Sequence, residues 1–219
     1  MAVIPARAGS KRIPAKNHKV LAGKPLISWT VEAALSSNMF EDIIVATDSI
    51  EVIEICKSYN IKIVARPEWT ASDDSTTATL LECLYPLLSD YSNLCYLQPT
   101  SPLRNHFHIV EAFRILNDSN SSNLVSVTKT RLTIENLFLN KNGKIISLTQ
   151  ALDNEGSKSH LFYPNGAIYI SKVDDLKKRE FNLLSKVESV YIMPEEKSID
   201  IDYEADFVLA NYLLSHGLV

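Results

Sequence analysis

Short runs of β-branched and other apolar residues alternate with longer segments of helical period along the first part of the chain. The runs have the length of buried strands and cover residues 2–4, 43–45, 61–64, 94–97 and 124–127. The helical segments lie between them, at residues 25–36, 49–59, 76–88 and 105–116. Because parallel neighbouring strands need crossover connections, this alternation predicts a mostly parallel sheet with helices on both faces. We therefore expect a three-layer α/β/α fold.

Two of the helical segments carry more specific signals. Asp48 and Glu51 stand at the spacing of a capping box around the start of the second segment. Phe107, Val110 and Phe113 recur at helical spacing in the fourth segment, so they share one face of that helix. We expect Asp48 to cap the second helix and the Phe107 face to be the apolar face of the fourth.

The alternation breaks after residue 128. Residues 129–160 are mostly polar, and a turn signal at residues 140–144 separates the apolar groups 137–139 and 145–146. This pattern predicts a β-hairpin that protrudes from the α/β body. A lone hairpin buries its apolar residues poorly, which favours a contact with a second copy of the chain.

Regular structure returns in the last third of the chain. Strands are predicted at residues 167–170 and 187–192, and a closing helix at residues 203–216 has Gly217 as its stop signal. With 219 residues, the chain fits a single domain, residues 1–219, that carries one insertion.

The composition excludes several classes of protein. The 22 Lys and Arg residues against 26 Asp and Glu residues give a net charge of −4, so no bulk positive field exists to hold nucleic acid. The three cysteines have neither a zinc spacing nor a disulfide pattern. The sequence starts without the pattern of a secretion signal and has no segment near the ~18 apolar residues of a membrane span. We expect a cytoplasmic protein without a membrane partner.

One loop concentrates positive charge in this acidic chain. Residues 5–17 follow the first strand and carry Arg7, Lys11, Arg12 and Lys16 among small residues. Small residues let backbone N–H groups approach phosphate oxygens, and the carboxyl end of a strand in an open α/β sheet is a common ligand site. The loop matches neither the P-loop nor the dinucleotide-binding glycine motif. From these residues alone, a polyphosphate site and a solvated surface loop are both open.

Two further groups of polar residues are candidates for chemistry. Asp200 and Asp202 are two residues apart, a spacing that in extended backbone turns both carboxylates to one side, where they can share a hard cation. The alternative is an exposed polar face or a cap for the closing helix. Residues 73–77 are rich in hydrogen-bonding groups and begin a helix, for which N-capping is the alternative reading.

The loop resembles the first motif of the N-acylneuraminate cytidylyltransferases, the CMP-sialic acid synthetases, which reads approximately I-P-A-R-x-G-S-K-x-x-x-x-K-N. Further segments resemble the same family in the same order along the chain. They are residues 23–27, 46–49, 66–67 with 71–73, 97–104, 164–169 and 199–202. The resemblance implies the Rossmann-like fold of nucleotide-diphospho-sugar transferases and the transfer of CMP from CTP to the anomeric hydroxyl of a nine-carbon 2-keto acid, with release of pyrophosphate.

The resemblance also implies which residues bind the nucleotide. They are Arg7, Ser10, Lys11, Lys16, Asn17, Arg66 and Thr77. Arg7 and Lys16 occupy the phosphate-contact positions and are implied to be catalytic, while Arg66 and Thr77 are implied to bind the cytidine.

For the other substrate, the resemblance points to Gln98, Tyr169 and Phe181 as residues that face the sugar. Core packing is the alternative for Tyr169 and Phe181. Asp200 and Asp202 match the positions that hold Mg²⁺ in the family. The family also uses the insertion at residues 129–160 as a homodimer contact.

The sequence departs from the family pattern at three positions. Ala8 and Arg12 replace frequent glycines, and Tyr163 replaces a basic residue found in some members. Arg12 followed by Ile13 looks more like enzymes for pseudaminic acid, so the nine-carbon acid stays open between N-acetylneuraminic, legionaminic and pseudaminic acid. The alternatives are a cytidylyltransferase for the eight-carbon acid of lipopolysaccharide and a non-catalytic nucleotide-binding regulator on the same fold.

Overall fold

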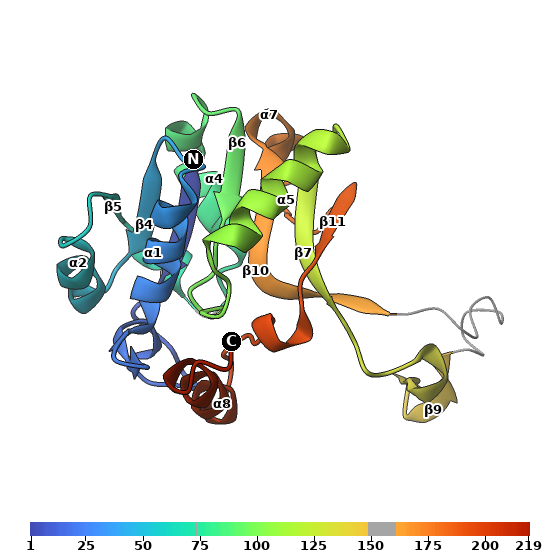
Figure 1. Ribbon diagram of the computed structural model, residues 1–219. Coiled ribbons are helices and arrows are strands. Elements are labelled where there is room, and N and C mark those ends of the chain that lie inside the picture. The colour runs from blue at the N-terminus through green and yellow to red at the C-terminus, as the bar shows by residue number, and fades with distance from the viewer. Residues whose placement is uncertain (73, 149–160) are drawn as a thin grey trace.

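The structure is a computed structural model of the chain and describes residues 1–72, 74–148 and 161–219 (Figure 1). Its centre is a seven-stranded sheet in the order β11-β7-β10-β6-β1-β4-β5. The strands are β1 (Ala2–Ala6), β4 (Ile43–Thr47), β5 (Lys62–Ala65), β6 (Asn93–Tyr96), β7 (Asn123–Lys129), β10 (Phe162–Lys172) and β11 (Ser189–Ile192). All neighbours are parallel except β10, which runs antiparallel to both β6 and β7. The predicted, mostly parallel sheet is confirmed.

Helices cover both faces of this sheet (Figure 1). They are α1 (Leu26–Ser37), α2 (Ile50–Cys56), α3 (Glu68–Ala71), α4 (Thr77–Leu88), α5 (His106–Asp118), α7 (Val173–Leu176) and α8 (Glu204–Ser215). Four short 3₁₀ turns complete the helical elements of the described residues: η1 (Lys16–His18), η2 (Ile134–Asn136), η3 (Lys177–Arg179) and η4 (Glu195–Lys197).

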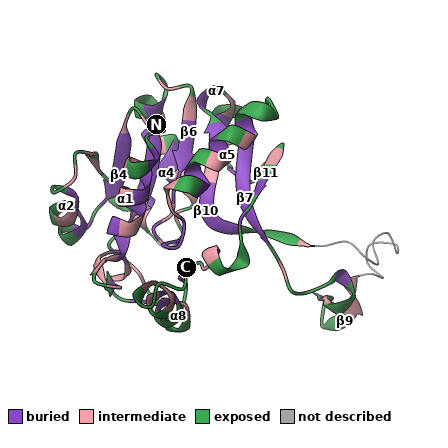
Figure 2. Ribbon diagram, in the orientation of Figure 1, coloured by how far each residue is buried: buried purple, intermediate pink, exposed green. Residues whose placement is uncertain are grey.

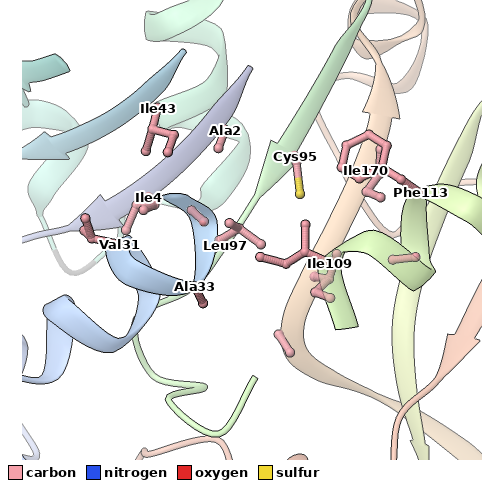
Figure 3. Close-up of a cluster of buried hydrophobic side chains, with 14 of the residues drawn as sticks. Ala2, Ile4, Val31, Ala33, Ile43, Cys95, Leu97, Ile109, Phe113 and Ile170 are labelled. Carbon is pink, nitrogen blue, oxygen red and sulfur yellow. The ribbon is translucent and has the colours of Figure 1, made fainter. Parts of the chain in front are cut away.

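The hydrophobic core is split by the sheet into two layers. Side chains alternate along β1, so that Ala2 and Ile4 pack with α1, α2 and α5, whereas Val3 packs with α4 and α7 on the opposite face. Figure 3 shows Ala2 and Ile4 beside Val31 of α1 and Ile109 of α5. The inner strands β1, β4, β6 and β7 are almost completely buried (Figure 2). This arrangement confirms the three-layer prediction.

Two local predictions about the helices are wrong. Ser49, and not Asp48, caps α2, because the Ser49 hydroxyl accepts a hydrogen bond from Val52 N–H. In α5 the buried face includes Ile109 and Phe113, whereas Phe107 and Val110 are 69% and 40% exposed. The spacing of three large residues placed them on one side of the helix, but the face that meets the sheet is rotated toward Ile109.

A separate two-stranded sheet is formed by β8 (Phe138–Lys141) and β9 (Lys144–Ser147), joined at Asn142 and Gly143. Both turn residues have positive φ, 54° and 83°, as two-residue hairpin turns require. Figure 1 shows this pair away from the seven-stranded sheet. The predicted strand pairing is therefore present, and residues 149–160 of the predicted insertion lie outside the described residues.

A third apolar cluster fixes the segments around the basic loop. Ile13 from the loop and Ile201 from the chain before α8 pack with Phe207 of α8. The small antiparallel pair β2 (Val20–Leu21) and β3 (Lys24–Pro25) contributes Leu21. The closing helix thus holds the basic loop and residues 199–202 side by side. None of the helices in the described part of the chain is long and apolar enough to cross a membrane.

Candidate active site

The basic loop opens into a pocket at the carboxyl end of β1. The pocket has a volume of about 260 Å³. Its walls include six of the residues predicted to bind a nucleotide, namely Arg7, Ser10, Lys16, Asn17, Arg66 and Thr77. These residues come from the loop, from the chain after β5 and from the first turn of α4. A surface loop without a binding role does not require residues from three segments to line one pocket. This arrangement therefore favours the interpretation of the loop as a phosphate site.

Hydrogen bonds from distant segments hold the loop in shape. The buried Asn17 side chain donates to the Arg7 carbonyl oxygen at 2.9 Å. Ala8 N–H donates to Asp48 Oδ1 at 2.7 Å, so Asp48 supports the loop instead of capping α2. Thr47, at the end of β4, donates from its hydroxyl to the Ala6 carbonyl oxygen at 2.6 Å. The loop is therefore fastened on both sides before any ligand binds.

The cations in the pocket are partly desolvated. Lys16 donates from Nζ to the Ile201 carbonyl oxygen at 2.7 Å. Burial lowers the pKa of Lys16, and the charges of Asp202 and Asp200 act in the opposite direction. Arg66 donates from Nε to the Thr70 carbonyl oxygen at 3.0 Å, and burial lowers its pKa as well. A site that removes water from two cations gains most when an anion binds there.

Two cations of the loop lie apart from this pocket. Lys11 is exposed and is not among the residues that line it, so its part in the phosphate cradle stays a prediction. Arg12 instead lies 3.2 Å from Asp202, measured between Nη1 and Oδ2, and its guanidinium covers the Tyr203 ring at 4.9 Å. The charge count of the loop thus overstates the number of cations that face the pocket.

A second pocket of about 400 Å³ adjoins the first. It is lined by all three residues predicted to face the sugar, Gln98, Tyr169 and Phe181. The two pockets share a wall made of Thr76, Thr77, Tyr96 and Gln98. Two ligands in these pockets would therefore meet at this wall.

The aromatic residues of the second pocket serve packing and lining at once. Tyr169 contacts Tyr96 edge to face, with ring centroids 6.3 Å apart, and Phe181 contacts Tyr85 in the same way at 5.6 Å. Burial, with a smaller effect of Asp200, raises the pKa of Tyr169 to about 12. The Tyr169 hydroxyl therefore stays protonated at neutral pH and can donate a hydrogen bond. Core packing and pocket lining are therefore both present at these two residues.

Asp200 and Asp202 flank the buried Ile201, whose N–H donates to the Thr100 carbonyl oxygen at 2.8 Å. Asp202 lies 3.9 Å from Lys16, measured between Oδ1 and Nζ. Asp200 remains accessible to solvent, yet the protein around it removes enough water to raise the pKa of its carboxyl group. The two aspartates and Lys16 thus form one charged group beside the loop.

The donor chemistry of this pair fits Mg²⁺ with substrate phosphates. Mg²⁺ is usually bound by one or two carboxylates together with phosphate oxygens and water. Among the described residues, no group of three or more His, Cys, Asp or Glu side chains is placed to hold a metal ion by itself. Asp200 and Asp202 therefore supply a partial set of ligands, which a bound triphosphate would complete.

Sequence reasoning missed several residues of the site. Tyr96 forms part of the shared wall, and Glu180, Asn182 and Leu183 line the second pocket. Tyr96 ends a strand, so the rule that ligands bind at carboxyl ends of strands could have found it. Glu180 lies in irregular structure with a positive φ of 52°, and no sequence pattern identifies it.

Solved structures with the same architecture establish the class of fold. One is a CMP:2-keto-3-deoxy-manno-octonic acid synthetase complexed with CTP, with a TM-score of 0.71 and 16% identity over 99% of this chain and 98% of that one. Another is the 4-diphosphocytidyl-2C-methyl-D-erythritol synthase of Anaerococcus prevotii, with a TM-score of 0.72 and 11% identity over 97% and 96%. The fold is that of the Rossmann-like nucleotidyltransferases.

Sequence comparison gives the family. The family model described as cytidylyltransferase matches residues 1–214, and the chain belongs to this family. The N-acylneuraminate cytidylyltransferase of Escherichia coli O18:K1:H7 is 37% identical over 96% of this chain and 51% of its own length. The CMP-N,N'-diacetyllegionaminic acid synthase of Legionella pneumophila is 32% identical over 98% and 95%, and the pseudaminic acid cytidylyltransferase of Campylobacter jejuni is 30% identical over 97% and 95%.

These matches confirm the family that the motifs predicted. The chain spans about half the length of the Escherichia coli relative and of the Streptococcus agalactiae relatives, and nearly the full length of the Legionella and Campylobacter ones.

Proposed function

We propose that this chain transfers CMP from CTP to the anomeric hydroxyl of a nine-carbon 2-keto sugar acid and releases pyrophosphate. The observation that carries the proposal is the shared wall between the two pockets, formed in part by Tyr96 and Gln98. A cationic pocket on one side suits a triphosphate, and a pocket with aromatic and amide groups on the other suits a sugar. The reacting atoms would meet where the pockets join.

In this reaction the sugar hydroxyl forms a bond to the α-phosphorus, the bond from that phosphorus to the bridging oxygen breaks, and the hydroxyl proton is released. Such transfers depend on positioning and on neutralising charge. Arg7 would hold phosphate oxygens through its planar fork, and Lys16 would supply a point charge. Thr77, in the first turn of α4, places the positive end of that helix at the same wall.

Mg²⁺ is part of the proposal, held by Asp200 and Asp202. When bound, Mg²⁺ would supply positive charge that offsets the negative charge of the triphosphate. Lys16, which belongs to the loop, lies 3.9 Å from Asp202, so it would compensate the charge of both Asp202 and the phosphates.

Three of the relatives support a nine-carbon acid as the second substrate, since their names specify acylneuraminate, legionaminic acid and pseudaminic acid. The likeness to the octonic acid synthetase, at 16% identity, supports the fold and gives the eight-carbon alternative little weight. We further propose that the enzyme acts in the cytoplasm, where CTP is made, as a homodimer that serves the synthesis of cell-surface polysaccharide. The exposed apolar residues of the β8–β9 pair are the feature that favours the dimer.

The test is to incubate the protein with CTP, Mg²⁺ and, in turn, N-acetylneuraminic, legionaminic, pseudaminic and the eight-carbon acid. Product mass and pyrophosphate release are measured. We expect a CMP-sugar from one or more nine-carbon acids and no UMP-sugar when UTP replaces CTP, because groups that pair with the cytosine amino group stay unpaired against a carbonyl. Preferred turnover of the eight-carbon acid would establish that alternative, and nucleotide binding without pyrophosphate release would establish the regulator.

A further inference from the structure

A fully buried side chain, that of Asn165, precedes a glycine that packs against Gln98, a residue of the wall that the two pockets share. Asn165 is 1% exposed and sits in β10, where the pairing with β7 shifts register between Pro164 and Tyr169. Its amide makes hydrogen bonds to three other segments of the chain. Asn165 Oδ1 accepts from Ser126 Oγ at 2.6 Å, and Asn165 Nδ2 donates to Ser198 Oγ at 2.9 Å and contacts Met193 Sδ at 3.2 Å.

These hydrogen bonds fix the backbone on either side of Asn165. Asn165 Oδ1 also accepts from Ala167 N–H at 3.2 Å, which closes a tight turn around Gly166. The Asn165 carbonyl oxygen accepts from Ser101 Oγ at 3.4 Å, so the turn is joined to the segment that follows Gln98. An irregular turn in the middle of a sheet loses ladder hydrogen bonds, and the Asn165 side chain replaces them.

The turn brings Gly166 against one residue of the proposed metal site and one residue that lines both pockets. Gly166 has a φ of +78°, and a Cβ atom there would lie 2.9 Å from Asp200 Oδ2 and 3.0 Å from Gln98 Oε1. Asp200 is the proposed metal ligand, and Gln98 lines both pockets. The Cα of one glycine is therefore packed against both side chains, and its position limits where each of them can lie.

We propose that Asn165 is a positioning residue that sets the place of Asp200 relative to Gln98, and thereby aligns the metal with the sugar. The proposal rests on the proposed function. Ser198, the acceptor of the Asn165 amide, is two residues before Asp200, and Ser101 is three residues after Gln98. Asn165 thus joins the chain segments that carry the two residues.

The chemistry of the site requires an amide at position 165. Ser198 Oγ donates its proton to the Pro194 carbonyl oxygen at 2.8 Å, so it can only accept from residue 165. An ionised carboxylate at this position has no proton to donate and would face the Ser198 oxygen unpaired. Asn165→Asp therefore changes the hydrogen bonding with almost no change of volume.

Asn123 provides a matched control. Asn123 is also 1% exposed and is the first residue of β7. Its side-chain amide likewise both donates and accepts hydrogen bonds. Asn123 Nδ2 donates to the Lys186 carbonyl oxygen at 3.1 Å, and Oδ1 accepts from Glu188 N–H at 2.8 Å. Asn123→Asp therefore imposes a similar buried defect on residues 185–188, which follow Leu184 of the second pocket, and not on the segments that carry Asp200 and Gln98.

The experiment measures Mn²⁺ affinity by electron paramagnetic resonance in the presence of CTP, together with kcat, KM for the sugar acid and the melting temperature. We expect Asn165→Asp to weaken Mn²⁺ binding or lower kcat by about tenfold to a hundredfold, the range seen for groups that orient metal ligands. Asn123→Asp should lower the melting temperature to a similar extent and leave Mn²⁺ affinity within about twofold of wild type, because its hydrogen bonds reach neither of the segments that carry Asp200 and Gln98.

Ser198→Ala is the second variant, for use where Asn165→Asp does not fold, and it should lower Mn²⁺ affinity in the same direction. Equal losses in Asn165→Asp and Asn123→Asp, or normal Mn²⁺ affinity and kcat in Asn165→Asp, would overturn the positioning role. Absence of CMP transfer by the wild-type protein would instead overturn the proposed function. The two failures are therefore distinguishable.

Discussion

The guanidinium of Arg12 contacts the carboxylate of Asp202, with 3.2 Å between Nη1 and Oδ2, and the two belong to segments separated by most of the chain. Both side chains are more than half exposed, so the ion pair contributes little to stability. The ion pair is informative because of its position. Arg12 neutralises a proposed metal ligand and lines neither pocket. Arg12 thus pairs with a proposed metal ligand, whereas Arg7 lines the pocket that we propose for the triphosphate.

The first prediction separates these two arginines. Arg7→Lys keeps the charge but loses the planar fork, and we expect it to raise the barrier by about 2 to 3 kcal/mol, or roughly a hundredfold in kcat/KM. Arg12→Gly should change kcat/KM by less than about fivefold, since an exposed ion pair is worth about 1 kcal/mol or less. Steady-state kinetics with CTP and the sugar acid give both values. Equal losses would show that the loop chemistry is assigned to the wrong residues.

The second prediction concerns the proposed metal ligands. Asp202→Asn and Asp200→Asn should each lower kcat by at least about a hundredfold at any Mg²⁺ concentration that can be reached, because a neutral amide binds Mg²⁺ weakly. The fold should persist, since both side chains are solvent-accessible. Circular dichroism checks the fold, and pyrophosphate release checks turnover. Full activity of either variant near Mg²⁺ saturation would remove the metal assignment.

The sequence predicts those parts of the fold that depend on local pattern. Apolar runs identified each strand of the parallel half, and the polar break after residue 128 identified the β8–β9 pair. The reversed direction of β10, inserted between β6 and β7, is a long-range property that no local period encodes. The face of α5 was misjudged for the same reason, because burial of Ile109 over Phe107 depends on which side meets the sheet.

For the site, charge and the strand end pointed to the loop, and the aspartate spacing to a possible cation site, but each kept a structural alternative. The family resemblance singled out Arg7, Lys16, Asp200 and Asp202. The sequence could not show that Asp48 supports the loop, because its hydrogen bond to Ala8 joins segments 40 residues apart. Nor could it show what the Asn165 amide contacts, since its partners lie far away in the sequence. The chemical type and spacing of residues can suggest which of them would contact a ligand. The residues that position them are identified only by tertiary contacts, which the sequence does not show.

The third prediction tests the homodimer. Phe138 and Ile145 of the β8–β9 pair are 63% and 61% exposed, a cost that a second copy would remove. If that pair forms the contact, Ile145→Asp should convert a dimer into a monomer in light scattering after gel filtration. Ile50→Asp is the control, because Ile50 is 72% exposed at the start of α2, on the other side of the molecule (Figure 1). A wild-type monomer, or a dimer that survives Ile145→Asp, contradicts the prediction.

The last prediction concerns Gly166, where backbone conformation and side-chain contact can be tested separately. Gly166 has a φ of +78°, and Gly23, in the turn between β2 and β3, has a φ of +88°. Alanine at either position should cost about 1 to 2 kcal/mol of unfolding free energy, because a Cβ atom is strained at positive φ. At Gly23 the new Cβ would meet nothing within 4 Å, whereas at Gly166 it would lie 2.9 Å from Asp200 Oδ2. Gly166→Ala must therefore also displace the carboxylate, and we expect at least about a tenfold loss of kcat. Urea unfolding and kinetics on both variants decide the point: similar stability losses with a loss of kcat only in Gly166→Ala support the contact, and equal kcat in the two variants contradicts it.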